Sequence, residues 1–178
     1  MRAWKLMALV GTTVIALGAP LRAQDGRPTG TFDLKSGRFG RNFGEAQRPP
    51  DTLTIASSRV WAALPAVYAA LDIPLSVADT GSHVIGAMYL SRRRPIGGER
   101  LSRLLSCGDS SFGPNADHYE VQFTALSLVT PIDSAHSALT IAVNGVALAN
   151  GNSQRIACNT TGRLERRILE ELRKISGS

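Results

Sequence analysis

The sequence has few of the residues that common catalytic and metal sites need. Its 178 residues include only two cysteines and three histidines, and it contains no C-x-x-C motif, no H-x-x-x-H pair and no glycine-rich phosphate-binding loop. These absences disfavour a redox-active cysteine pair, a metal centre and a nucleotide-binding enzyme. With 43% hydrophobic and 19% charged residues, the composition excludes a collagen, a coiled coil, a multi-span membrane protein and a wholly disordered chain. We therefore predict a globular protein with no cofactor and no metal.

Residues 1–23 are predicted to be an export signal. Arg2 and Lys5 precede an uncharged run from Leu6 to Ala19, and Ala23 provides a small residue for cleavage. The run is shorter than the roughly 20 apolar residues of a membrane-spanning helix, so no transmembrane segment is expected after cleavage. Cleavage would remove three of the 20 basic residues and none of the 14 acidic ones, which lowers the net charge from +6 to +3. We expect a bacterial protein of the periplasm or exterior, for which nucleic acid is a disfavoured partner.

Residues 24–50 are predicted to be a flexible linker. Five glycines and three prolines occur among these 27 positions, and almost no aliphatic residues accompany them. Phe39 and Phe43 alternate there with Arg and Gly, a pattern similar to segments that contact partner surfaces. These two phenylalanines are candidates for docking onto a partner, and a solvated spacer is the alternative.

Residues 51–176 are predicted to form one α+β domain. The expected architecture is a single antiparallel sheet of about four to five strands with two amphipathic helices packed on one face, in the order β-α-β-β-(short α)-β-β-α. Alternating apolar residues favour strands near 53–55, 75–79, 83–91, 119–125 and 139–143. Apolar residues at three- and four-residue steps favour helices over 58–71 and 164–175, with a short helical piece at 101–105.

Several local features of this domain leave alternatives open. Asn144-Gly145 stands between two apolar stretches, which is typical of a hairpin turn, but one long strand with a glycine bulge would also fit. Pro65 interrupts the first helical pattern, so that helix either begins or kinks there. The candidate capping residues are Ser57 or Ser58 for the first long helix and Thr160 or Thr161 for the last.

Cys107 and Cys158 are predicted to form a structural disulfide. An exported chain with two cysteines favours pairing them, and no further metal ligand flanks either residue. The closed loop of about 50 residues would contribute about 4 kcal/mol to stability in the chain-entropy account.

A polar loop holds the best catalytic candidates. Ser110 and Ser111 follow Gly108-Asp109, and Asp117-His118 lies a few residues later, so that a nucleophile, a base and an orienting acid all occur. The nucleophile-elbow spacing G-x-S-x-G is not met, because the second glycine comes one residue late. A small secreted serine hydrolase is therefore the alternative function, and a loop whose polar groups cap local backbone is the simpler interpretation.

The densest positive cluster is the leading candidate for binding. It comprises Arg92, Arg93, Arg94, Arg100 and Arg103. Arginine clusters bind phosphate head groups, acidic glycans and acidic protein surfaces, although charged residues at a strand end also protect a sheet edge from pairing. The leading hypothesis is a non-enzymatic envelope binding or assembly module, with an envelope protein or an anionic surface as its partner.

Overall fold

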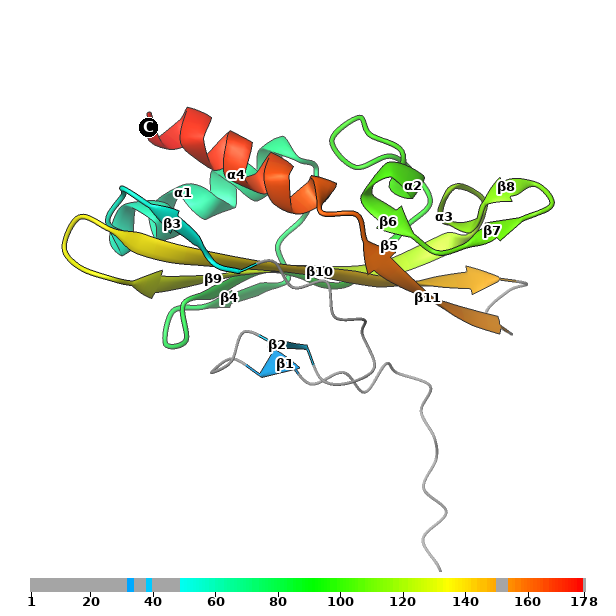
Figure 1. Ribbon diagram of the computed structural model, residues 1–178, viewed down its shortest axis with the longest axis horizontal. Helices are drawn as coiled ribbons and strands as arrows, with labels where there is room; N and C mark the ends of the chain where they lie inside the picture. Colours follow the sequence, from blue (N-terminus) through cyan, green and yellow to red (C-terminus); the bar gives the residue numbers. More distant parts are fainter. Residues whose placement is uncertain (1–31, 34–37, 40–48, 150–153, 178) are drawn as a thin grey trace, which may run out of the picture.

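The computed structural model describes residues 32–33, 38–39, 49–149 and 154–177 (Figure 1). The predicted export signal, Phe43 and most of the predicted linker lie outside the described residues. Of Phe39 the backbone alone is described. Figure 1 shows a broad sheet seen nearly edge-on, with all the helices above it and the short β1 and β2 pair below it.

An antiparallel sheet of seven strands forms the body of the molecule. Its order is β4, β5, β9, β10, β11, β6, and the short strand β3 pairs with the start of β10. The strands span Asp51–Leu53 (β3), Val77–Asp79 (β4), Val84–Arg92 (β5), Leu105–Ser106 (β6), Glu120–Pro131 (β9), Ser137–Ala149 (β10) and Gln154–Thr160 (β11). Two small ladders lie outside this sheet, β1 (Phe32–Asp33) with β2 (Arg38–Phe39), and β7 (Asp109–Ser110) with β8 (Gly113–Pro114).

The predicted fold class, a single sheet of about four to five strands with two helices, is wrong. The described residues form one seven-stranded sheet and four helices, so strands dominate the structure. The helices are α1 (Ser57–Ala70), α2 (Leu101–Leu104), α3 (Asn115–His118) and α4 (Arg163–Ser176). The missed strands have a physical explanation: β6 is two residues long, and the sequence QRIACNT of β11 lacks the alternation that marks a half-buried strand.

The long helices α1 and α4 cover one face of the sheet. Leu64 and Tyr68 of α1 and Ile168 and Leu172 of α4 are completely buried against the sheet. The Tyr68 hydroxyl lies 2.9 Å from Ser127 Oγ and donates a longer bond of 3.4 Å to the Ala125 carbonyl oxygen. Burial raises the pKa of the Tyr68 hydroxyl far above its ordinary value. The hydroxyl therefore stays protonated and anchors α1 to the central strand β9.

Neither long helix begins as its sequence predicted. Ala56 occupies the N-cap of α1 without a side-chain hydrogen bond, and the helix continues through Pro65 instead of starting there. Gly162 is the N-cap of α4, in the left-handed conformation. Thr160 acts from outside the helix, where its hydroxyl accepts the Gly162 N–H and donates to the Glu165 carboxylate at 2.6 Å. The predicted serine and threonine caps are therefore wrong.

The hairpin considered at Asn144-Gly145 does not exist, because β10 runs straight through both residues. Gly145 pairs with Phe123 of β9 on one side and with Cys158 of β11 on the other, with no shift of register. A Cβ atom at Gly145 would lie 3.2 Å from Leu105 Cδ1 and 3.3 Å from Val121 Cγ1. The absence of a side chain at Gly145 therefore lets Leu105 and Val121 pack closely over a long central strand, and the glycine forms no turn.

The predicted disulfide between Cys107 and Cys158 is confirmed. It joins the residue directly after β6 to Cys158 within β11, and the two strands also pair at Asn159↔Ser106 and Thr160↔Leu105. The bond therefore fastens the chain segment that carries α2 to the edge of the sheet.

Candidate functional site

The arginine cluster lies where the chain leaves β5 and turns toward α2. Ile96 and Glu99 exchange two backbone hydrogen bonds of 3.0 Å across this turn. Arg167 of α4 reaches over from the long helix and donates to the carbonyl oxygens of Ile96 at 3.2 Å and Gly97 at 2.9 Å. Ile96 is buried in the core. The turn is thus attached to both the core and α4, which gives the neighbouring arginines a fixed backbone.

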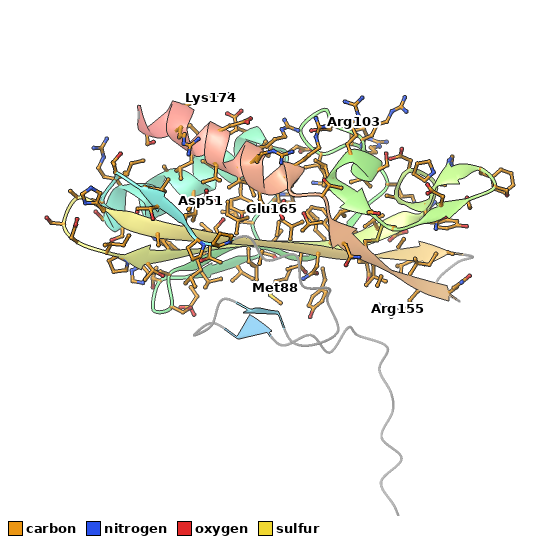
Figure 2. All side chains as sticks on the ribbon, in the orientation of Figure 1. Asp51, Met88, Arg103, Arg155, Glu165 and Lys174 are labelled. Atoms are coloured by element: carbon orange, nitrogen blue, oxygen red, sulfur yellow. A yellow bond between two sulfur atoms is a disulfide. The ribbon has the colours of Figure 1, made fainter. Side chains whose placement is uncertain are left out.

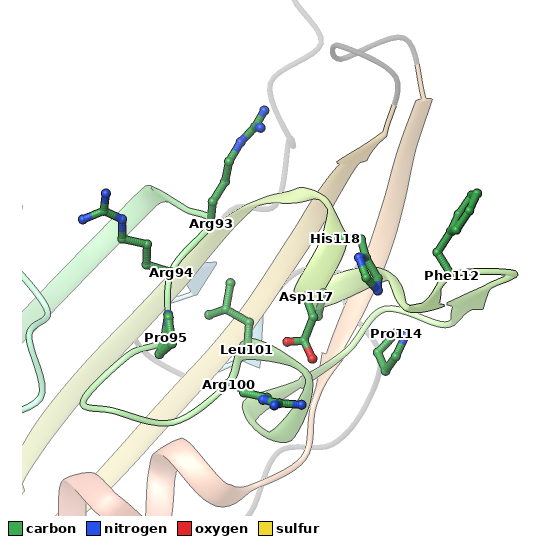
Figure 3. Close-up of a pocket in the computed structure, with 10 residues that line it drawn as sticks. Arg93, Arg94, Pro95, Arg100, Leu101, Phe112, Pro114, Asp117 and His118 are labelled. Carbon is green, nitrogen blue, oxygen red and sulfur yellow. The ribbon is translucent and has the colours of Figure 1, made fainter.

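Two hollows open beside this turn, and Arg100 lines both. The first, of about 440 Å³, has Arg93, Arg94 and Arg100 along its lining together with Asp117, His118 and Phe112 (Figure 3). The second, of about 560 Å³, has Arg100, Arg103, Arg167 and Glu99. Figure 3 shows that Arg93 and Arg94 come from the segment after β5, whereas Asp117 and His118 come from α3 and Phe112 from the β7–β8 turn. Residues distant in the sequence therefore meet around Arg100.

Three guanidinium groups of the cluster have no partner in the part of the chain that the structure describes. These belong to Arg94, Arg100 and Arg103, and all three residues are exposed. Arg93 pairs with the Glu120 carboxylate at 3.2 Å. Hydrogen bonds from the Ser91 hydroxyl and from Arg93 hold the pKa of Glu120 below its ordinary value. Positive charge at the hollows is therefore only partly neutralised.

Arg92 is separated from the other arginines of the predicted cluster. It is the last residue of β5, on the helix-side face of the sheet opposite Val121, and its guanidinium donates to the Asp72 carbonyl oxygen at 2.7 Å. This contact secures the segment that follows α1. Four of the five predicted binding arginines lie around the two hollows, and the fifth has a structural contact.

The second hollow contains a carboxylate that is already paired. Glu99 forms ion pairs with Arg163 at 2.9 Å and with Arg167 at 3.5 Å, both from α4. Sequence reasoning missed these three residues, because arginines 64 and more positions away offer no local signal of the contact. It also missed Phe112, whose side chain is 81% exposed at the tip of the β7–β8 turn. An aromatic side chain inside a polar loop was the available signal for that residue.

The catalytic candidates do not form the hydrogen bonds of a serine hydrolase. The Ser110 hydroxyl donates to the Gly113 carbonyl oxygen at 3.1 Å. The Asp117 carboxylate accepts the Ser102 N–H at 3.0 Å and the Ser102 hydroxyl at 2.6 Å, at the first turn of α2. No hydrogen bond joins His118 to Asp117, Ser110 or Ser111 among the described residues. Asp117 therefore serves to hold α2 and α3 together, and the hydrolase stays a prediction without support from these contacts.

The comparisons with known proteins add no family. No protein-family model matches the chain, and no curated protein matches it. Within the described ranges, no group of three or more His, Cys, Asp or Glu side chains could hold a metal ion. No helix of that same part of the chain has both the length and the apolar character to cross a membrane.

Proposed function

We propose that this protein is an exported, non-enzymatic binding module that holds an anionic partner at Arg93, Arg94, Arg100 and Arg103. These four residues are called the arginine site below. The observation that supports the proposal is the position of Arg94, Arg100 and Arg103 around two adjoining hollows, where their guanidinium groups have no partner among the described residues. Exposed arginines with no protein partner are available to form new charge-assisted hydrogen bonds.

The chemistry of the site favours phosphate, sulfate or carboxylate groups. A guanidinium presents a planar fork of donors that matches the oxygens of these anions, and it remains charged at every physiological pH. Arg100 precedes α2, whose Leu101 and Leu104 are buried in the core, so the backbone beneath this fork is anchored. A fixed backbone reduces the conformational entropy that the protein loses on binding. Phosphate head groups, acidic glycans and acidic protein surfaces all supply such oxygens in a cell envelope.

The test is a charge reversal at the residue that both hollows share. Arg100→Glu in the full chain is compared with Arg173→Glu, which makes the same change of charge on the exposed last turn of α4. We expect Arg100→Glu to weaken binding to a sulfated polysaccharide and to vesicles of anionic phospholipid by about tenfold or more, because a hydrogen bond to a charged group is lost. Arg173→Glu is expected to change binding much less. Circular dichroism shows whether both variants remain folded.

Two results would contradict the proposal. Equal weakening by both substitutions would mean that overall charge, and not the arginine site, determines binding. No measurable binding of the unchanged chain to either anionic probe at low salt would remove the basis for an anion site altogether.

A further inference from the structure

The sheet has a second apolar face, on the side opposite α1 and α4. Its residues alternate along the strands with those that contact the helices, so Leu126 of β9 lies directly beside Ala142 of β10. Val84 of β5 and Val146 and Leu148 of β10 belong to the same face by register. Figure 2 shows Met88 of β5 below the sheet, on this side, and Lys174 of α4 above it.

Five apolar side chains near the middle of this face are as deeply buried as those beneath the helices, whereas Arg155 and Ala157 of β11, on the same face, are exposed. The exposed fractions of Val84, Leu126, Ala142, Val146 and Leu148 lie between 2% and 9%. None of these residues belongs to the cluster that α1 and α4 cover. A sheet with helices on one side leaves its other face to water, and large apolar patches are rare on the surfaces of soluble monomers. The low exposure therefore requires a cover.

The chain supplies a candidate cover from its own N-terminal part. β1 and β2 form an antiparallel ladder in which Phe32 stands opposite Phe39, and Figure 1 shows this ladder on the side of the sheet away from the helices. The chain joins the sheet at Asp51, which pairs with Leu139 of β10. About a dozen residues separate β2 from β3, and an extended chain of that length spans up to about 40 Å. Seven strands about 4.8 Å apart are no wider than that, so β1 and β2 can reach the centre of this face.

We infer that the segment containing β1 and β2 docks on this second face of the sheet and covers Leu126, Ala142 and Val146. This interaction lies on the opposite side of the sheet from the helices, and Leu126, Ala142 and Val146 line neither of the two hollows of the arginine site. It also changes the interpretation of Phe39, because the docking surface that we infer for its segment belongs to the same chain. An outside partner of this segment would then compete with the sheet for it.

The test measures how fast a cysteine on each face of β10 reacts with a thiol reagent. Ala142→Cys reports on the second face, and Ala147→Cys, on the opposite face of the same strand, reports on the face beneath the helices. Each is made in the full chain and again in a chain that also carries Phe32→Ser and Phe39→Ser. We expect both cysteines to react slowly in the chain with its phenylalanines. With the serines present, the reaction at position 142 should accelerate by about tenfold or more while position 147 stays protected. The reason is that the cysteine reacts only when the docked segment opens, and weaker docking lowers the free energy of that opening.

Three other results would overturn the inference. Fast reaction at position 142 in the chain that keeps Phe32 and Phe39 would show that the face is not covered. An unchanged rate after the serine substitutions, or an equal rise at both positions, would show that the phenylalanines do not act on this face in particular. Protection that falls on dilution of the protein would assign the cover to a second copy of the chain, whereas protection that does not depend on concentration supports docking within one chain.

Discussion

At the scale of single residues, Gly86 allows the backbones of two neighbouring strands to approach closely. This residue of β5 pairs with Leu126 of β9 on one side and with Val77 of β4 on the other. Its φ is +154°, and a Cβ atom there would lie 2.1 Å from the Ala125 carbonyl oxygen. The strand registers shift directly after it, between Ala87 and Leu90. A side chain at this position would therefore push β5 away from β9 at the point where the strand bends.

We expect Gly86→Ala to destabilise the domain by about 2–4 kcal/mol, because the methyl group meets rigid backbone of a central strand. Gly98→Ala is the matched control: Gly98 also has a positive φ, +78°, but apart from its chain neighbours no described residue has an atom within 4 Å of its Cβ position. That substitution should cost about 1 kcal/mol, the strain of a left-handed conformation alone. Urea unfolding of the two variants gives the comparison. Equal costs would show that β5 adjusts without loss and that close approach does not matter there.

At the scale of elements, the disulfide compensates for the shortness of β6. This strand contributes only two residue pairs to β11, too few to hold an edge strand by themselves. The Cys107–Cys158 bond adds a covalent link beside those pairs. Because β6 follows α2 directly, the same link keeps α2 near the end of the sheet where the arginine site lies.

Replacing both cysteines by serine is expected to lower the free energy of unfolding by about 4 kcal/mol, since the bond closes a loop of about 50 residues in the unfolded chain. The measurement is guanidinium unfolding of the variant and of the unchanged protein with and without a reductant. Reduction of the unchanged protein should produce nearly the same loss as the double substitution. A loss of less than about 1 kcal/mol in both experiments would mean that the two β6–β11 pairs suffice.

For the molecule as a whole, sequence reasoning was most successful where one periodicity applied. The apolar stripe of α4 and the run at 83–91 placed α4 and β5 within a few residues, and the alternation at 119–125 found the start of β9 but not its end at Pro131. It failed where tertiary contacts determine the local structure. Gly145 is an example, because its small size allows close packing against Leu105 and Val121. β10 is buried on both faces, so its sequence carries no clear alternation and its length was underestimated.

The arginine site was foreseeable only in part, for the same reason. Adjacent arginines identify a positive segment, but a strand directs neighbouring side chains to opposite faces, and so Arg92 is separated from Arg93. The contribution of α4 through Arg163 and Arg167 depends on how the long helix lies over the turn at Glu99. Such contacts between distant segments follow from packing and have no signature in a single sequence.

The charge balance around Arg93 predicts that anion binding at the proposed site depends on pH. The hydrogen bond from Ser91 and the contact with Arg93 lower the pKa of Glu120 below its ordinary value of 4.5. Glu120 is therefore ionised at neutral pH and offsets Arg93. The folded-state pKa is depressed, so the stability that these contacts contribute is present above the unfolded-state value and is lost as the pH falls through the folded-state value. Over that same range, below about pH 4.5, Arg93 loses its partner and the site becomes more positive.

We therefore expect affinity for a sulfated polysaccharide, which stays anionic in acid, to rise as the pH falls below about 4.5. Glu120→Gln should reproduce this at pH 7, with binding about two- to fivefold tighter, because an exposed ion pair makes a modest contribution. It should also flatten the rise in acid. Asp133→Asn removes the same charge from the β9–β10 turn, where Ala135 and His136 lower the pKa of Asp133. The affinity of each variant is measured by titration at fixed ionic strength. An equal gain in affinity from the two substitutions would attribute the effect to net charge. A gain confined to Glu120→Gln would place the bound anion beside Arg93.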